Sequence, residues 1–359
     1  MITVSADRLR TQLDEIFKAW GMEESFRRIC VQQMIEADLM GIDSHGIGML
    51  PTYEQNRLNG ALIVNPTVTV VHEHQAVALM DGGHGMGHIA ATKGMQSAIE
   101  KAQHFGLGAV NVRQSNHYGA AGVYSNMARR SGLLGISMTG TTQRSVVPTF
   151  GRESRFSTNP IAFAAPGAAT DGFSLDMATS TVAIGKILVA KRAGKSIPTG
   201  WALDAQGQPE TDPATALAAV PKRLTPLGGT RELGSHKGYG LAVMVEILSS
   251  ILSESYIGGH SLETGEKGQF INVGHFFLAL DPVAFLGKSG IFEASLDRLT
   301  AYLRATLPAD SDQPVLVAGD PERIAHATRT RHGVPMTDAL AEEIREVCRS
   351  CGAPFLLTT

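Results

Sequence analysis

The sequence predicts an α/β protein in which short strands and helices alternate through the middle of the chain, between helical segments at both ends. Two patterns support this prediction. Apolar residues recur at the spacing of one helix face in the first 40 residues and again beyond residue 290. Between these segments, short β-like runs such as GAVNV at 108–112 alternate with helical stretches. The 39 glycines and the aromatic content of 6% are typical of α/β proteins with many tight turns.

The composition argues against several classes of protein. The 359 residues are 43% hydrophobic and 18% charged, the balance of a globular chain long enough for two domains. A net charge of −3 gives no electrostatic reason to expect nucleic acid or a membrane surface as a partner. No apolar run reaches the length of a transmembrane helix, and the stretch MITVSADRLR lacks the apolar core of a signal peptide. We therefore expect a cytoplasmic protein with neither kind of partner.

The cysteines point to the same compartment. Three occur, Cys30, Cys348 and Cys351, and an odd, small number argues against a disulfide framework. Cys348 and Cys351 form a C-x-x-C, but no second pair completes a zinc site. We interpret them as incidental thiols at the end of a helix.

The N-terminal segment predicts two helices. The first follows an N-cap candidate at Ser5 and carries apolar residues on one face. The second helix ends near Gly41, and the stretch DSHGIGMLP at 43–51 is expected to be a loop with a closing proline.

The middle of the chain predicts strands in TVTVV, AVALM, GAVNV, LLGISM, IAFAAP, FSLDM and HFFLAL. Helices are expected up to about residue 104, up to Arg130, from about 181 to 193, and over the apolar run KGYGLAVMVEILSSIL. The segment 194–236 is rich in Gly, Pro and Asp and is expected to be a long excursion. Beyond residue 290 the chain is expected to be mostly helical.

The turn at 81–87 matches part of a dinucleotide-binding fingerprint. Gly83 and Gly85 fit G-x-G-x-x-G, but the third position is His88, and the next strand ends in Val112 and Arg113 without an acidic residue. An ordinary Rossmann site is therefore not predicted. The same region carries four histidines, but no carboxylates accompany them in a metal-binding signature, so no metal site is predicted. They are His72, His74, His84 and His88.

Two loop histidines are candidates for proton transfer. His45 follows Ser44 and precedes Gly46, which permits close approach of a ligand. Histidine suits proton transfer near neutral pH. A Ser-His-Asp acyl-transfer site is conceivable there, but no G-x-S-x-G elbow supports it. His117, in SNHYG, follows a strand, where ligand sites of α/β sheets commonly lie.

Two further stretches are candidates for binding an anion or a ribose. Asp176 ends a strand in DMATS, although the small residues after it could simply cap the next helix. Lys237 opens the most apolar helix, where a cation opposes the helix dipole unless it faces an anion.

These stretches together resemble the malate/L-lactate dehydrogenase family, and the resemblance covers nearly the whole chain. It rests on ordered blocks: SHG at 44–46, SNHYGAAG at 115–122, STNPIAFAAPG at 157–167, LDMATS at 175–180, IPTGWALDAQGQP at 197–209 and HKGYGL at 236–241. The run DSHGIGMLPTY is most similar to the branch containing hydroxycarboxylate dehydrogenase B.

The resemblance implies a non-Rossmann NAD(P)-binding β/α domain over 67–289, with the excursion 194–236. It also implies a helical domain built from 1–66 and 290–359. The family is dimeric, so a homodimer is expected, with the active site near the subunit interface. The implied cofactor is NAD or NADP, with no metal.

The resemblance also implies roles for individual residues. His45 is the implied acid/base with Ser44 beside it, and His117 is a second catalytic candidate. The implied cofactor contacts are Thr142, Asn159, Ser174, Leu175, Asp176, Met177, Ala178, His236, Lys237, Gly319 and Asp320.

One departure concerns the substrate. Many relatives carry an arginine five residues after the SHG serine, suited to clamp a carboxylate, whereas this chain has Met49. Arg144, Arg155 and Lys191 are the alternative anchors, and Met49 suggests an apolar side-chain pocket. The block AGD at 318–320 also stands where relatives often have PGE.

The expected function is NAD(P)-dependent interconversion of small 2-oxo acids and 2-hydroxy acids. The nearest alternative is reduction of a cyclic imino acid such as piperideine-2-carboxylate. A non-catalytic ligand-binding relative and a histidine-rich metal hydrolase are alternatives from other classes.

Overall fold

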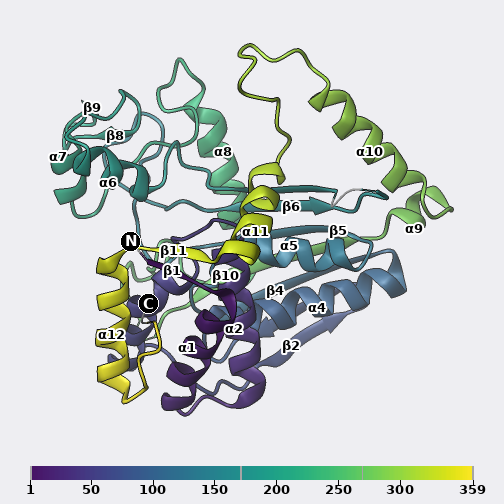
Figure 1. Cartoon of the computed structure of the whole chain (residues 1–359), viewed down its shortest axis with the longest axis horizontal. Coiled ribbons are helices and arrows are strands. Elements are labelled where there is room, and N and C mark those ends of the chain that lie inside the picture. Colours follow the sequence, from purple (N-terminus) through teal and green to yellow (C-terminus); the bar gives the residue numbers. More distant parts are fainter. Residues whose placement is uncertain (1, 170–171, 269, 358–359) are drawn as a thin grey trace.

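The computed structural model describes residues 2–169, 172–268 and 270–357, and the two ends of the chain meet in it. Strand β1 (Ile2–Val4) pairs antiparallel with β11 (Val334–Met336), and Thr3 lies opposite Pro335. Both termini therefore lie on the same side of the molecule (Figure 1). The sequence analysis predicted neither strand.

Helices from both ends share one hydrophobic core. These are α1 (Ala6–Ala19), α2 (Glu24–Leu39), α3 (Leu50–Leu58) and α12 (Asp338–Cys351). The predicted N-cap is confirmed, because the Ser5 hydroxyl accepts a hydrogen bond from the Arg8 amide at 3.3 Å. The buried side chains of this core include Leu13, Ile16, Phe17, Met34, Tyr53, Ile344 and Val347.

The expected loop at 43–51 is shorter than predicted. A 3-10 turn at Ile47–Met49 leads directly into α3. Pro51 therefore lies in the first turn of a helix instead of closing a loop, a position that proline tolerates because that amide has no helical partner.

A seven-stranded mixed sheet forms the middle of the molecule. Its strand order is β2-β3-β4-β10-β5-β6-β7, and only β3 and β4 run parallel. The strands are β2 (Thr69–His74), β3 (Val77–Asp81), β4 (Leu107–Ser115), β5 (Leu134–Thr139), β6 (Ile161–Ala165), β7 (Phe173–Met177) and β10 (Val273–Leu280). The prediction of an α/β fold is confirmed.

Both faces of this sheet are covered by helices. On one face lie α4 (Gly87–Phe105) and α5 (Ala121–Arg130), which pack against Phe277. On the other face, α8 (Ser235–Val245) continues as a π-helix, Glu246–Ile251, whose residues pack near Phe276. Phe276 and Phe277 face opposite ways because side chains alternate along a strand.

The excursion has structure of its own. Helices α6 (Ile184–Arg192) and α7 (Pro213–Ala218) and the short strands β8 (Ala202–Leu203) and β9 (Pro209–Glu210) form a small lobe (Figure 1). Its core contains Val146, Phe156, Ile187, Ile197 and Leu224.

After β10 the chain passes through α9 and α10 before it returns to the terminal helices. Helices α9 (Pro282–Leu286) and α10 (Ile291–Arg304) lie away from the terminal helices in Figure 1. Helix α11 (Asp320–His332) packs on α2, and Arg329 donates a hydrogen bond to the Asp38 carbonyl at 2.7 Å. The division into two domains stays a prediction. None of the helices in the described residues has both the length and the apolarity needed to cross a membrane.

Candidate active site

A buried histidine joins the three central strands of the sheet near their ends. His275, near the start of β10, shares hydrogen bonds with the Ser115 hydroxyl at 2.8 Å and the Thr139 hydroxyl at 2.7 Å. Ser115 ends β4 and Thr139 ends β5. The ring of Tyr118 stacks on His275 at 4.6 Å between centroids. Burial lowers the pKa of His275 to about 3, so this group stays neutral and structural.

The loop that follows β4 holds His117 in a fixed position. The hydroxyl of Tyr53, from α3, lies 2.8 Å from Nδ1 of His117. The side-chain amide of Asn116 donates to the carbonyls of His84 and Gly85, each at 3.0 Å. Since Nδ1 is engaged, Nε2 is the His117 nitrogen that can meet a substrate.

The glycines of the 81–87 turn accommodate the protein's own backbone. A Cβ at Gly87 would overlap the Asn116 carbonyl oxygen, and one at Gly83 would lie 2.7 Å from the Thr67 carbonyl oxygen. These glycines are therefore explained by close packing of the chain, without any bound pyrophosphate.

The SHG loop is built on a buried carboxylate. Asp38, at the end of α2, accepts a hydrogen bond from the Ile47 amide at 2.9 Å, and burial raises the pKa of Asp38 to about 7. A Cβ at Gly46 would overlap this carboxylate, so only glycine fits there. Arg329 of α11 forms an ion pair with Asp43 and fixes the other side of the loop.

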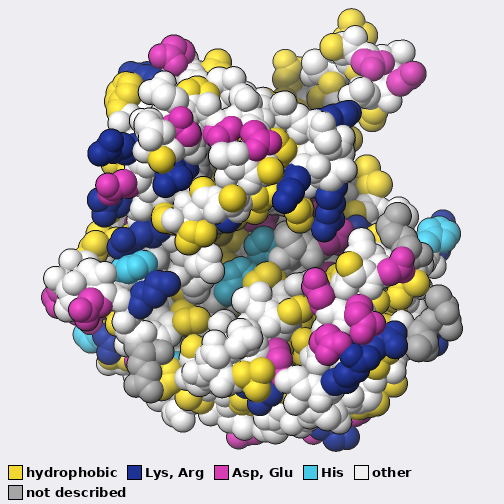
Figure 2. All heavy atoms as spheres, turned by 90° about the vertical axis from the view of Figure 1, so that its left-hand side faces the viewer, with side chains coloured by type: hydrophobic (Ala, Val, Ile, Leu, Met, Phe, Trp, Pro, Cys, Tyr) yellow, Lys and Arg dark blue, Asp and Glu magenta, His cyan; other side chains and the backbone are white. Residues whose placement is uncertain are grey.

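This loop brings His45 beside His117. Their rings lie 5.4 Å apart at an angle of 35°, and the Ser44 hydroxyl lies 2.7 Å from Nδ1 of His45. Both rings are half-buried. Burial lowers the pKa of His45, and burial and the neighbouring histidines lower the pKa of His117 well below its usual value. The surface is hollowed between two lobes, and histidine side chains lie at the floor of the hollow (Figure 2).

A third histidine lies behind this pair. The ring of His88 meets that of Tyr53 edge-on at 5.6 Å. Burial lowers the pKa of His88 to about 3. Neither ring nitrogen has a hydrogen-bond partner within the part of the chain that the structure describes.

Strand β7 and helix α5 form a second part of the site. The Gly122 amide donates to the carboxylate of Asp176 at 2.7 Å, and Asn126 donates to the Ser174 hydroxyl at 2.9 Å. Residues two apart on a strand thus meet residues four apart on a helix, because each spacing repeats one face of its element. Burial raises the pKa of Asp176 to about 6.

A surface cavity lies between β7 and the segment before α11. It has a volume of about 220 Å³, and Ser174, Leu175, Asp176 and Gly319 contribute to its lining. A Cβ at Gly319 would lie 3.2 Å from Ser174, and the φ of Gly319 is +97°, so this close approach favours glycine. The β7 strand is an edge strand, and the Ser174 amide on its outer side donates to the Ala318 carbonyl at 3.3 Å, which ties the segment before α11 to this edge.

Asp320 lies beside this cavity, but its carboxylate has structural partners. Arg304 binds both oxygens, at 2.8 and 2.9 Å, and Arg323 pairs with the same group. The Val317 amide also donates to it at 2.8 Å. Asp320 therefore has a structural role, which is to hold the segment before α11 in place beside the cavity.

The other predicted cofactor contacts do not line this cavity. Asn159 is fully buried; its amide donates to Glu246 at 2.7 Å and accepts from the Ser157 backbone at 3.0 Å. His236 and Lys237 are exposed in the first turn of α8. Thr142 is half-buried in the loop after β5, and Met177 and Ala178 lie at and just beyond the end of β7.

The interpretation of the small residues after Asp176 as helix caps was wrong. Helix α6 begins at Ile184, with Ala183 as the N-cap residue. The Thr179 hydroxyl instead donates to the carbonyls of Thr158 and Asn159, each at 3.0 Å. These hydroxyls therefore tie loops together, and the helix starts later than the expected residue 181.

The three carboxylate-anchor candidates differ in their surroundings. Met49 packs partly against the core of the terminal helices. Arg155 is exposed and forms an ion pair with Glu153, and Lys191 is exposed on α6. Arg144 is half-buried in the loop after β5, and its buried Nε has no hydrogen-bond partner among the described residues.

The residues considered for metals and redox chemistry are scattered. Across residues 2–169, 172–268 and 270–357, no three His, Cys, Asp or Glu side chains gather as metal ligands. His72 and His74 are exposed on β2. Cys348 and Cys351 lie as free thiols in the last turns of α12.

Comparison with known proteins identifies the family of this fold and site. A profile of the malate/L-lactate dehydrogenase family matches residues 4–345, and the chain belongs to that family. It is 37% identical over 356 residues to a malate dehydrogenase of Pyrococcus horikoshii, covering 99% of this chain and 97% of that protein. It is 31% identical over 352 residues to hydroxycarboxylate dehydrogenase B of Escherichia coli K12, covering 97% and 94%. A solved malate dehydrogenase of Entamoeba histolytica superposes with a TM-score of 0.92 at 33% identity, covering 98% and 99%.

Proposed function

We propose that this protein interconverts small 2-oxo acids and 2-hydroxy acids with NAD or NADP as the redox partner. The observation that supports this most directly is the pair of half-buried histidines, His45 and His117, whose rings lie 5.4 Å apart. Each has its Nδ1 held by a neighbouring hydroxyl. Such a pair can position and protonate a small carbonyl compound.

The cavity beside β7, called the β7 groove from here on, is the proposed cofactor site. It combines an edge strand, a close glycine at Gly319 and a lining that includes Ser174 and Asp176. A nicotinamide dinucleotide bound there would supply or accept the hydride. The sheet is mixed, and the glycines of the 81–87 turn pack closely against the protein's own chain. Both observations support a binding mode unlike a Rossmann site.

His117 is the proposed proton carrier. When Nε2 is unprotonated, Nδ1 carries the ring proton and donates to the Tyr53 hydroxyl, and this hydrogen bond remains when Nε2 takes up a second proton. In the oxidation direction, a neutral Nε2 accepts the proton of the substrate hydroxyl. In the reduction direction, a bound carboxylate favours the protonated ring, which gives its proton to the new alkoxide oxygen.

Arg144 is the proposed anchor for the substrate carboxylate in place of an arginine at position 49. It lies in the loop after β5, at the end of the sheet where β4 also finishes, and its buried Nε lacks a partner among the described residues. A guanidinium can bind a carboxylate through two hydrogen bonds.

The proposed assembly is a homodimer. Five apolar side chains form an exposed stripe on one face of α8 and its π-helical extension: Val243, Met244, Ile247, Ile251 and Leu252. The opposite face of this helix is buried on the sheet. A contiguous exposed apolar stripe is typical of a protein interface.

A substrate panel tests the function. NADH and NADPH oxidation would be followed with pyruvate, oxaloacetate, 2-oxoglutarate, phenylpyruvate and a cyclic imino acid. Turnover of an oxo acid supports the proposal, whereas turnover of the imino acid alone would favour the C=N reductase. If neither NADH nor NADPH is oxidised with any of these compounds, the proposal is contradicted.

A further inference from the structure

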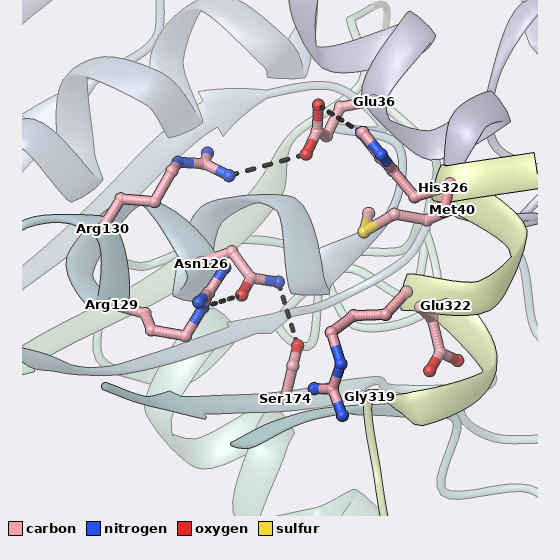
Figure 3. A pocket seen from close by; sticks show the side chains of 11 residues that line it. Glu36, Met40, Asn126, Arg129, Arg130, Ser174, Gly319, Glu322 and His326 are labelled. Carbon is pink, nitrogen blue, oxygen red and sulfur yellow. Dashed lines mark hydrogen bonds and ion pairs between the residues drawn. The ribbon is translucent and has the colours of Figure 1, made fainter. Parts of the chain in front are cut away.

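A second cavity lies beyond the β7 groove, where three helices meet. It has a volume of about 300 Å³ and is lined by side chains from α2, α5 and α11. Figure 3 shows Glu36 of α2, Arg129 and Arg130 of α5 and His326 of α11 arranged around it. Ser174 and Gly319 line this cavity as well as the first one, so the two cavities share a wall.

The charged lining of this cavity is net positive. Three arginines, Arg129, Arg130 and Arg323, outnumber the two glutamates, Glu36 and Glu322. Guanidinium groups bind phosphate oxygens in pairs of hydrogen bonds, and arginines from two helices can converge on one phosphate.

The ion pairs that Arg130 and His326 form with Glu36 are loose, whereas Arg323 pairs closely with Asp320. Arg130 lies 3.5 Å from Glu36, and His326 lies 4.0 Å from the same carboxylate. Charge-assisted hydrogen bonds are usually about 2.7–2.9 Å long. Arg130 can therefore turn from Glu36 toward an entering anion at small energetic cost.

The position of the cavity matches the outer end of a dinucleotide. Helix α5 meets β7 first at Gly122 and Asp176 and then, one turn later, at Asn126 and Ser174. Arg129 lies eight residues after the start of α5, which is about 12 Å at the helical rise of about 1.5 Å per residue. The cavity thus lies one further turn away from the histidine pair, within reach of the adenosine half of a dinucleotide.

We infer that this cavity receives the 2′-phosphate on the adenosine ribose of NADP(H), so that the protein prefers the phosphorylated dinucleotide. The inference rests on the proposed function. In Rossmann dinucleotide sites a carboxylate binds the free ribose 2′-hydroxyl, whereas a nearby arginine accommodates a 2′-phosphate, and the same charge complementarity applies here. Glu322, in the first turn of α11, remains suited to a neighbouring ribose hydroxyl.

The test uses nucleotide fragments, so that it does not depend on catalysis. Calorimetry would compare adenosine 2′,5′-bisphosphate with adenosine 5′-monophosphate, a fragment that lacks the 2′-phosphate. We expect the bisphosphate to bind about tenfold more tightly. Arg130→Gln and Arg129→Gln should each remove most of this difference while leaving the affinity for the monophosphate nearly unchanged.

Arg28→Gln is the matched control, because Arg28 is an exposed helix arginine of α2 paired with Glu24. It should leave both affinities unchanged. Equal affinities for the two fragments, no binding of either, or a preference that survives both substitutions would overturn the inference.

These outcomes are separable from failure of the proposed function. Turnover of a 2-oxo acid with NADH but no phosphate preference would overturn this inference alone. Arginine-dependent binding of the bisphosphate without turnover of any oxo acid would support the cavity assignment and contradict the proposed reaction.

Discussion

At the scale of single residues, some groups of the proposed site could be predicted from sequence motifs and others could not. His45 and His117 could be found because each stands in a glycine-rich loop motif. Tyr53 and Asp38 could not, because each is one polar residue in a helix without any local pattern, and only the fold brings them to the loops. The structural role of His275 could not be predicted either, because it is a single polar residue in an apolar strand.

Arg144 provides a test of substrate binding at this scale. Arg144→Met should raise KM for the oxo acid by about tenfold to a hundredfold, because it removes a charge-assisted carboxylate contact. Cofactor affinity should not change. Steady-state kinetics and a separate cofactor titration would measure both effects.

Arg155→Met is the control, since Arg155 is exposed and pairs with Glu153. It should leave KM unchanged. Equal KM values for the wild type and Arg144→Met would remove Arg144 from the site.

At the scale of elements, strands with strong β-branched and apolar runs were predicted well, and short ones were not. Strands β4, β6, β7 and β10 follow the expected segments. Strands β1 and β11 have three residues each, and their pairing joins the two ends of the chain. No local signal predicts such a contact, because its energy comes from the shared core.

The SHG loop provides a stability test of one element. Gly46→Ala introduces a Cβ that overlaps the Asp38 carboxylate, and we expect it to lower the free energy of unfolding by about 1–3 kcal/mol. The displaced loop should also lower turnover, because His45 directly precedes it. Urea denaturation and steady-state assays would measure these losses.

Gly185→Ala serves as the comparison, because a Cβ there has no neighbour within 4 Å. If the two alanine variants are equally stable, the account of the loop is wrong.

His275, which joins β4, β10 and β5 through its hydrogen bonds, should make the stability of the protein depend on pH. Its native pKa is lowered from 6.5 to about 3, so between these values the unfolded chain binds a proton that the native protein does not. Stability from this group is therefore complete above pH 6.5 and falls as the pH is lowered. Relative to His275→Gln, the wild type should lose about 2 kcal/mol of unfolding free energy between pH 7 and pH 5.

Urea denaturation of both proteins at the two pH values measures this difference. Taking the difference cancels the buried carboxylates Asp38 and Asp176, whose raised pKa values act in the opposite direction. A gap between the proteins that stays constant with pH would show that His275 titrates normally.

At the scale of the whole molecule, the two ends of the chain form one helical core, and the loops that carry His45 and His117 lie where this core meets the helices and strands of the sheet. The resemblance to the malate/L-lactate dehydrogenase family implied a helical domain built from both ends, and its separation from the β/α domain stays a prediction. The position of α10, away from the terminal helices, was not anticipated, because helical periodicity says nothing about which neighbour a helix finds.

The assembly can be tested on the stripe of α8. The double variant Ile247→Glu/Ile251→Glu places two charges on the exposed apolar face and should shift a dimer to monomers in sedimentation velocity, because burying unpaired charge is costly. Val71→Glu, at a similarly exposed valine of β2, should leave the mass unchanged. A monomeric wild type, or a double variant that still forms a dimer, would contradict the proposed interface.

The most direct test of the central claim is the turnover of the best 2-oxo acid by the wild type and by His117→Asn, measured beside the binding of NADPH to each. The account predicts that the wild type is active and that the variant loses about 10²–10⁴-fold in kcat while binding the cofactor equally well. A wild type that turns over no oxo acid, or a variant with unchanged kcat, would contradict it.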